Sequence, residues 1–433
     1  MSPRAKPANP LRRAVTAIRN IRERHGERNR PTGFHFALAD RVDFLNGEAW
    51  DQVAQGSSVF LRREVLRAFE RTGPKNIAPR YVILYRDDKP VAVIAAQIVT
   101  LTGRQLELDD VIAKRAKTPA FFKRALSPAA KMATAKLDER LLVAGNIMSW
   151  GFHGIAFAAG KDPAQLWPGV AEALYRIRRS DRLLGQANIV MVKDITERQS
   201  GLEALRRFSY RPLETEPNMV LEINPAWRHY EDYLAALDAK YRRNAKDQIK
   251  KLAAGGCVLE RLADLRADAG RLHELYLNVH ANAPLRWFTL PEDFLPSLAA
   301  ALGDDFRCTV VRRGEEILGF VTTLRDGPTA IAYYIGFDRA AAAEGLPIYL
   351  RLLHATIGDA ISWGCTRLSL GRTALEPKAS MGAKPEPLSF WLRHRISSVN
   401  WMFRGLLDVV PHGEAPERNP FKTTGSQSGS PLP

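Results

Sequence analysis

Residues 308–338 read CTVVRRGEEILGFVTTLRDGPTAIAYYIGFD, which is three apolar runs separated by two polar turns. The first two runs, around a turn at 313–316, predict a β-hairpin, and the third run predicts another strand. The next stretch, PIYLRLLHATIGDAISWG, has apolar residues at helical spacing and predicts an amphipathic helix. It is followed by CTRLSLGRT, which predicts a buried strand. The order is therefore hairpin, strand, helix, strand.

The same order occurs earlier in the chain. The run YVILYRDDKPVAVIAAQIV at 81–99 predicts a hairpin, and LLVAGNIMSWGFHGIAFA at 141–158 predicts the next strand. The helix-like LWPGVAEALYRIRRSDRLLG and the strand-like ANIVMVKDI then follow. This alternation predicts an α/β (α+β) protein with two similar domains, each a mixed sheet flanked by helices.

The length of 433 residues also favours two domains over one hydrophobic core. We expect them to join near Asn224-Pro225, with the first at 35–225 and the second at 226–410. Residues 1–34 are expected to form a flexible basic arm, with a basic amphipathic helix on a membrane or RNA as the alternative. The composition of 411–433 predicts a flexible tail.

The cysteines and the length of the apolar runs argue against several classes of protein. The three cysteines are far apart and odd in number, which argues against a disulfide framework or a zinc site. We expect no metal. The longest apolar run, VAVIAAQIVTL, is too short to cross a bilayer. The expected location is the cytoplasm, with peripheral contact at the inner face of the membrane as a further option.

Most of the net charge of +16 lies in two short segments. Residues 1–30 carry nine basic and two acidic side chains, and KYRRNAKDQIKK at 240–251 carries six basic and one acidic. The second segment falls in a stripe from Leu234 to Leu252 that predicts one helix with its basic residues outside. Solvation alone would explain such a face, but Arg242, Arg243 and Lys246 are also candidates to bind a phosphate-bearing partner.

The stretch LGRTALEPKASMGAKP, at 370–385, follows the last predicted strand of the second domain. Cations set among small residues after a buried strand favour a pocket, because ligands of open α/β sheets bind at the carboxyl ends of strands. The candidates here are Arg372, Glu376, Lys378 and Lys384. The simpler interpretation pairs Arg372 with Glu376 and leaves the lysines solvated.

Two further places could contribute to a site. Tyr333 and Tyr334 are adjacent in a strand, so we expect one to face the core and the other a cleft. In the first domain, AGNIMSWGFHGIAF sets Asn146, Ser149 and His153 among glycines, which in a strand often mark a bulge or a close approach. A lone histidine such as His153 is more often structural than catalytic.

These stretches together resemble the FemA/FemB-like branch of the GNAT acyltransferase superfamily, which includes the BioF2-like acetyltransferase domain. The resemblance rests on the basic helix, on the strands and helix of 315–371, and on the run that begins at Leu370, and it covers about residues 35–410. It implies two GNAT-like domains in tandem, each with a mixed, mostly antiparallel sheet. The usual Gln/Arg-x-x-Gly-x-Gly/Ala loop for coenzyme A is replaced by DRAAAAEGLP.

The resemblance implies an N-acyltransferase of the GNAT type. The donor would be acyl-CoA, a carrier-protein thioester or aminoacyl-tRNA, and the acceptor an amine, including cell-envelope or polysaccharide precursors. Three groups of residues receive roles. Glu376, Lys378 and Tyr334 would act in catalysis, and Ile335, Gly336 and Gly345 would hold the carrier. Substrate-binding residues would be Arg372, Lys384, Arg242, Arg243, Lys246, Asn146, Ser149 and His153. The alternative is a non-catalytic basic protein that binds nucleic acid or an anionic membrane surface.

Overall fold

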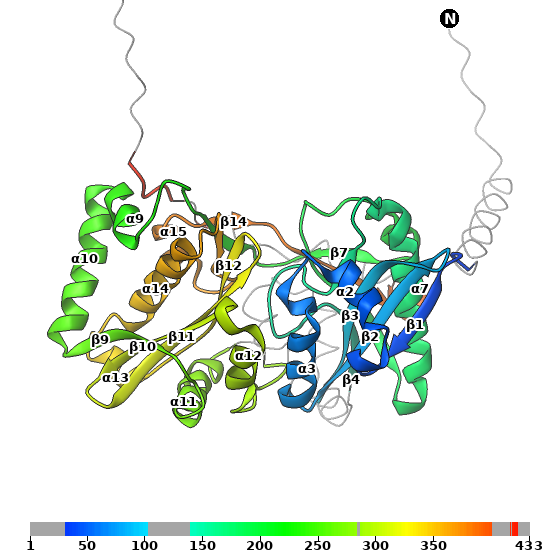
Figure 1. The fold of residues 1–433 in the computed structure, drawn as a ribbon, viewed down its shortest axis with the longest axis horizontal. Helices are drawn as coiled ribbons and strands as arrows, with labels where there is room; N and C mark the ends of the chain where they lie inside the picture. The colour runs from blue at the N-terminus through cyan, green and yellow to red at the C-terminus, as the bar shows by residue number, and fades with distance from the viewer. Residues whose placement is uncertain (1–30, 103–138, 284–285, 401–415, 417, 423–433) are drawn as a thin grey trace, which may run out of the picture.

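The structure, a computed structural model, describes residues 31–102, 139–283, 286–400, 416 and 418–422. Two mixed sheets lie side by side, each flanked by helices (Figure 1). The predicted fold class is confirmed. Most of the predicted arm, 1–30, and most of the predicted tail lie outside the described residues. The described part of that tail, 418–422, contacts the second domain through a bridge between Leu237 and Phe421.

The first sheet is mostly antiparallel and has one parallel pair, β4 with β6. The strands in spatial order are β1 (His35–Ala39), β2 (Ile77–Arg86), β3 (Lys89–Leu101), β4 (Glu139–Ala144), β6 (Ala187–Ile195), β15 (Ser389–His394) and β7 (Arg211–Glu214), with β5 (Ile155–Phe157) paired to β3. Two pairs of helices cover its faces. These are α2 (Gly47–Ala54) with α3 (Arg63–Thr72), and α7 (Pro163–Ser180) with α8 (Glu203–Arg207).

The second sheet has the equivalent order and again one parallel pair, β12 with β13. Its strands are β9 (Cys257–Leu262), β10 (Phe306–Arg313), β11 (Glu316–Asp326), β12 (Thr329–Phe337), β13 (Arg367–Ser369), β8 (Asn218–Glu222) and β14 (Lys384–Glu386). Its main helices are α10 (Ala239–Ala254), α11 (Ala269–His280), α12 (Phe294–Leu302) and α14 (Ile348–Ser362).

Both predicted hairpins are confirmed. β2 and β3 pair across a turn in which Asp87 and Asp88 have φ of 51° and 58°, the left-handed values of a two-residue hairpin turn. β10 and β11 pair across a turn that contains Gly314, with φ of 58°. The predicted order of hairpin, strand, helix and strand is therefore present in both sheets.

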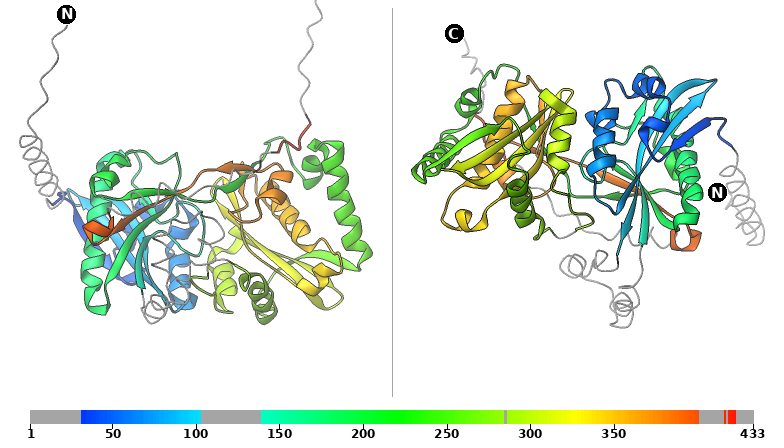
Figure 2. Two further views of the ribbon diagram at one scale, coloured as in Figure 1. Left: turned by 180° about the vertical axis from the view of Figure 1, so that it is seen from behind. Right: turned by 60° about the horizontal axis from the view of Figure 1, so that its bottom comes forward.

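Each sheet contains one strand that comes from the other half of the sequence. β8 follows β7 after three residues, yet it pairs with β13 and β14 of the second sheet. β15 follows β14 after two residues, yet it pairs with β6 and β7 of the first sheet. Figure 2 shows the orange segment of β15 crossing into the blue and green first domain. The ranges 35–225 and 226–410 therefore do not coincide with the two sheets.

One hydrophobic cluster extends through both domains. It includes Trp50, Phe60 and Phe69 of the first domain and Phe294 and Phe320 of the second. The rings of Phe69 and Phe294 stack at 5.7 Å between α3 and α12. Since buried apolar area of this kind stabilises an interface, the domains form a continuous core rather than two loosely linked units.

The helix predicted over 234–252 is wrong as a single element. The chain forms α9 (Tyr230–Ala236), breaks at Leu237 and Asp238, and continues as α10. Within α10, Ala245 and Leu252 are buried, whereas Ile249, which belongs to the predicted apolar stripe, is exposed. Among the described residues, no helix is long and apolar enough to cross a membrane.

Candidate functional site at the domain junction

A loop of the first domain, residues 146–153, extends toward the second. The chain leaves the sheet at Gly145, whose N–H donates to Ala95 O, and returns at Gly154, whose carbonyl accepts from Ala95 N. A Cβ on Gly154 would lie 2.2 Å from Gly145 Cα, so the two chain segments touch where the loop closes. The predicted close approach of backbone at these glycines is therefore present, and it shapes the 146–153 loop.

The 146–153 loop contacts the carboxyl end of β13 and the interior of β12. Trp150 Nε1 donates to Ser369 Oγ at 3.0 Å, and Tyr334 Oη donates to Met148 O at 3.0 Å. Gly371 has φ of 81°, and a Cβ there would lie 3.1 Å from the Trp150 ring. The glycine that follows β13 is thus required by a turn packed against the first domain.

A buried charged cluster holds the base of the same loop. Asp194 is fully buried, accepts from Gly151 N at 2.9 Å and contacts both Lys193 Nζ and Arg372. Lys193 Nζ also donates to Ser149 O at 2.7 Å. Burial lowers the pKa of Lys193, against the opposing effect of Asp194. The cluster joins β6 to the segment after β13 and so fixes the domains at the junction.

His153 takes part in a second polar contact between the domains. Its Nδ1 lies 2.9 Å from Ser58 Oγ and 3.3 Å from Asp326 Oδ2, while Nε2 lies 2.9 Å from Trp150 O. Burial lowers the pKa of His153, with Asp326 acting in the opposite direction. Because Trp150 O only accepts, Nε2 carries a proton, and His153 connects the 146–153 loop to Ser58 and Asp326.

β12 and β13 diverge at this junction. They pair only from Thr329 to Ile331, after which β13 ends while β12 continues to Phe337. A bulge between β11 and β12 falls at Tyr333 and Tyr334. The expected alternation is therefore wrong here, since both tyrosines belong to or pack against the hydrophobic cluster that extends through both domains. Burial raises the pKa of both phenols well above the usual value.

Lys378 lies in α15 (Leu375–Ser380), directly after the divergent strand. It is 3% exposed, and among the described residues no ion pair or hydrogen bond engages its ammonium group. Burial lowers its pKa to about 7. A lysine with this pKa is neutral in about half of the molecules at pH 7, so Lys378 can accept a proton.

The other predicted residues of this segment lie in different environments. Arg372 contacts Asp194 at 3.2 Å, so the alternative pairing with Glu376 is wrong. Glu376 is exposed and contacts Arg418 instead. Lys384 is exposed in β14. Of the four, only Lys378 combines burial with a missing counter-charge in the described part of the chain.

The three residues expected to hold the carrier lie in different local environments. A Cβ on Gly336 would lie 2.6 Å from the backbone of α11, so that glycine permits close helix packing. Ile335 pairs with Val321 of β11, and Gly345 forms an exposed turn. Asp338 caps α13 (Arg339–Ala343) by accepting from Ala340 N and Ala341 N. These N–H groups are already engaged by a carboxylate, so this loop does not fit the usual pyrophosphate site.

The cationic candidates on α10 divide into two groups. Arg242 donates to Leu237 O at 2.9 Å and thereby satisfies the end of α9. Arg243 and Lys246 are exposed. In the first domain, Ser149 Oγ donates to Asn146 O at 3.2 Å, so Ser149 stabilises the loop rather than facing a ligand.

Sequence reasoning missed several residues at the junction. Asn218, which lies in β8, accepts from Ser369 Oγ at 3.0 Å and from Gly371 N at 3.1 Å. Lys193 and Asp194 appear in the sequence only as a polar pair inside an apolar run. That pair of charges in a buried strand was the available signal, but none of their partners outside the pair is local, and Arg372 lies 178 positions away.

The family model described as acetyltransferase (GNAT) domain matches residues 239–379. These residues form a GNAT domain. The match begins in α10 and ends in α15, so it contains Tyr334, Arg372 and Lys378. The predicted enzyme class, a GNAT-type acyltransferase, is confirmed. The predicted tandem arrangement agrees with a first sheet of the same strand order.

Several solved structures are similar to this chain at low identity. FemX is 10% identical, with 83% of this chain and 98% of FemX covered at a TM-score of 0.48. A tandem GNAT protein from the clavulanic acid pathway is 11% identical, with 83% and 98% covered at 0.46. L-PGS from Bacillus licheniformis is 11% identical, with 81% and 96% covered at 0.41. No curated protein matches the sequence of this chain.

Proposed function

We propose that this protein is an N-acyltransferase that moves an acyl or aminoacyl group from a thioester or ester carrier to an amine. The observation that carries the proposal is the GNAT match over 239–379, which includes the divergent strands and Lys378. In this reaction the amine nitrogen attacks the activated carbonyl carbon. The tetrahedral intermediate then expels the thiolate or alkoxide of the carrier.

Lys378 is our candidate for the proton acceptor. The attacking amine must lose one proton, and the leaving group must gain one. A neutral Lys378 Nζ would take the proton from the amine and return it to the leaving oxygen or sulfur, so no other acid is required. The absence of a carboxylate contact in the described residues supports this role, since an ion pair would keep the lysine charged.

Arg372 has a different proposed role. Its contact with buried Asp194 supports a positioning function, in which it holds the end of β13 against the first domain. Tyr334 would act in the same way through Met148, because its hydroxyl is buried and already donates. Of the cations predicted to bind the phosphate-bearing donor, the exposed Arg243 and Lys246 remain the candidates, and Arg372 is not one of them.

The test compares two lysines of one segment. Purified protein would be incubated with acyl-CoAs, carrier-protein thioesters and charged tRNA, together with cell-envelope, polysaccharide and small-metabolite amines. Mass spectrometry would detect N-acyl products. We expect Lys378→Met to lower the rate of product formation by roughly 10² to 10⁴ and Lys384→Met, at an exposed site, to retain it. Equal loss in both variants, or no product from any donor with the unchanged protein, would contradict the proposal.

A further inference from the structure

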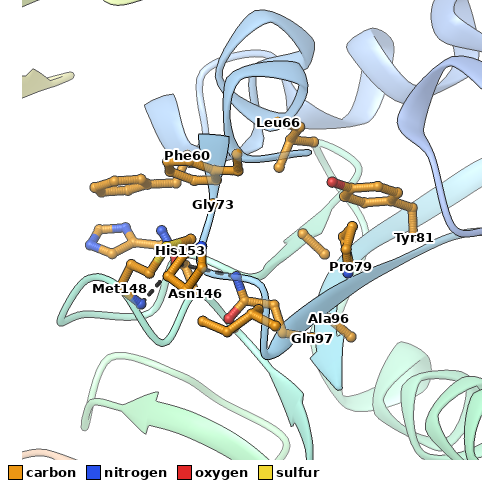
Figure 3. A pocket seen from close by; sticks show the side chains of 15 residues that line it. Phe60, Leu66, Gly73, Pro79, Tyr81, Ala96, Gln97, Asn146, Met148 and His153 are labelled. Atoms are coloured by element: carbon orange, nitrogen blue, oxygen red, sulfur yellow. Dashed lines mark hydrogen bonds between the residues drawn. The ribbon is translucent and has the colours of Figure 1, made fainter. Parts of the chain in front are cut away.

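A small space lies inside the first domain, beside Phe60, Tyr81 and Asn146 (Figure 3). Its volume of about 30 Å³ has room for a water molecule but not for a larger partner. The surface of the same domain carries a different feature. Leu183 and Leu184 are adjacent in the chain, and they are 98% and 73% exposed. A single exposed leucine is ordinary, but an adjacent pair exposed to this extent indicates a surface that meets a partner.

The two leucines are held outward by the turn on which they lie, η3 (Asp181–Leu184). Asp181 is buried and accepts from Arg80 Nη2 at 2.7 Å and from Arg140 Nη2 at 3.2 Å. Arg140 also donates to the carbonyl of Gly185, directly after the turn. Both ends of the turn are thus fixed to strands β2 and β4, so the leucines are presented to solvent from a rigid support.

Five arginines accompany this turn. Burial and then the nearby Arg393 lower the pKa of Arg178, and Arg395 adds to the effect. Arg395 N donates to Asn188 O at 2.9 Å, which ties this arginine to the strand that follows the turn. In the part of the chain that the structure describes, none of the five forms an ion pair with a carboxylate. We call the following residues the α7 tip: Arg178, Arg179, Arg182, Leu183, Leu184, Arg393 and Arg395.

The position of the arginines has a simple explanation only in part. Cations stabilise the C-terminal end of a helix, as Arg178 and Arg179 do for α7. This effect does not account for Arg393 and Arg395, which come from the end of β15 and the residue after it, or for the exposed leucines. An apolar pair among unpaired cations matches an anionic lipid surface, where phosphate groups lie above an apolar interior.

Two other occupants fit the α7 tip less well. A symmetric contact between two copies of this chain would bring the arginines of both copies together, and like charges repel. A nucleic acid would satisfy the arginines, but its charged backbone would leave Leu183 and Leu184 without an apolar environment.

From this arrangement we infer that the α7 tip binds the surface of an anionic lipid bilayer. Leu183 and Leu184 enter the boundary between headgroups and acyl chains, and the arginines contact lipid phosphates. The inference goes beyond the proposed reaction, because it concerns where the protein binds and not which group it transfers. It also concerns a different part of the chain from the predicted basic arm at 1–30.

The first test places a fluorescent reporter on the tip. The native cysteines are buried, so an NBD label attached through Leu183→Cys reports on that position. Vesicles of phosphatidylcholine and phosphatidylglycerol at about 7:3 should strengthen and blue-shift its emission, whereas pure phosphatidylcholine should not. Val258→Cys, at a position of β9 that is 57% exposed, is the control, and its label should not respond. No acyl donor is present, so failure of this test would leave the proposed function unaffected.

The second test separates the tip from the overall charge of the protein. Arg179→Glu with Arg182→Glu reverses two exposed cations of the tip, and Lys250→Glu with Lys251→Glu reverses two exposed cations of α10. Both double variants change the net charge by the same amount. Only the first should weaken co-sedimentation with the anionic vesicles, by about tenfold or more.

The third variant removes the apolar pair. Leu183→Ser with Leu184→Ser should also weaken vesicle binding about tenfold or more, and it should unfold at the same urea concentration as the unchanged protein because both positions are exposed. The inference is overturned if the label at residue 183 does not respond to anionic vesicles, even when the protein binds them through another part of the chain. It is also overturned by an equal response to single-stranded RNA, or by equal binding of the two charge variants.

Discussion

Lys378 combines two properties that rarely coexist, deep burial and the absence of a counter-charge in the described structure. We expect the transfer rate to rise with pH and to level off above about pH 7, as the lysine loses its proton. Lys378→Met should lower the rate by roughly 10² to 10⁴. A pH–rate profile measures both effects. A profile without an inflection near pH 7 would contradict the role as proton acceptor.

The same lysine should affect stability. Its folded pKa is below the ordinary value of 10.5, so the unfolded chain binds more protons between pH 7 and 10.5. The contribution of this residue therefore becomes more favourable as pH rises through that window. Lys378→Met should remove this dependence and unfold at higher urea concentration than the unchanged protein at pH 6. Urea denaturation at pH 6 and pH 9 would distinguish the two proteins.

Arg372 and Glu376 are close in sequence but should contribute differently to the free energy of unfolding. Arg372→Ala would leave fully buried Asp194 without one of its two cationic contacts, and we expect a loss of about 1–3 kcal/mol of unfolding free energy. Glu376→Ala breaks only an exposed contact with Arg418 and should change stability by less than about 0.5 kcal/mol. Equal effects in urea denaturation would argue against a structural role for the Arg372 pair.

Lys378 and Arg372 show which properties of the site could be predicted from the sequence. Lys378 could be selected because a lysine among small residues after a strand is conspicuous. The burial of Lys378 could not be predicted from the sequence, because it depends on how α15 packs. Arg372 was assigned to a ligand because its partner, Asp194, lies in a strand of the other domain and leaves no local sequence signal.

At the scale of elements, local patterns predicted most of the secondary structure. The hairpin turns predicted at 86–90 and 313–316 and helices α7 and α14 follow from periodicity and turn residues. The break between α9 and α10 was not predicted, because the apolar residues continue at helical spacing across it. It is stabilised by distant contacts, including the pairing of Leu237 with Phe421.

Helix α10 offers a test of carrier binding. Arg243→Glu combined with Lys246→Glu reverses two exposed charges, so we expect weaker, less salt-dependent binding of phosphate-bearing donors with little change in stability. Arg242→Ala should instead lower stability by about 0.5–1.5 kcal/mol, because it removes the donor to Leu237 O. Fluorescence anisotropy of a labelled donor at two salt concentrations would measure the first effect. Unchanged binding by the double variant would exclude α10 from the donor site.

At the scale of the whole molecule, the exchange of strands and the shared hydrophobic cluster could not be predicted from the sequence. The repeat of strand order indicated two domains, but the same order is compatible with two self-contained sheets. The exchange of β8 and β15, and the core cluster that includes residues of both halves, depend on which neighbouring surfaces fit best. Such choices are made by tertiary packing.

These features predict a single cooperative unfolding transition. Trp391 of β15 is buried in the core of the first domain, although it belongs to the last described strand. Trp391→Ala should cost about 3–5 kcal/mol and should shift the unfolding of both domains together. Hydrogen exchange along β6 and β11 during urea denaturation would follow each sheet separately. Two separated midpoints would show that the domains unfold independently.

The exchange of strands also bears on how the chain is made. β6 ends at Ile195, but its neighbour β15 is complete only at His394, about 200 residues later. At translation rates of 5–20 residues per second, roughly 10–40 s pass before the ribosome has added that strand. During this interval the nascent first sheet has an open edge at β6. The first domain should therefore depend on chaperone protection during synthesis, and a ribosome stalled before residue 389 should hold a chain that proteases cut at β6.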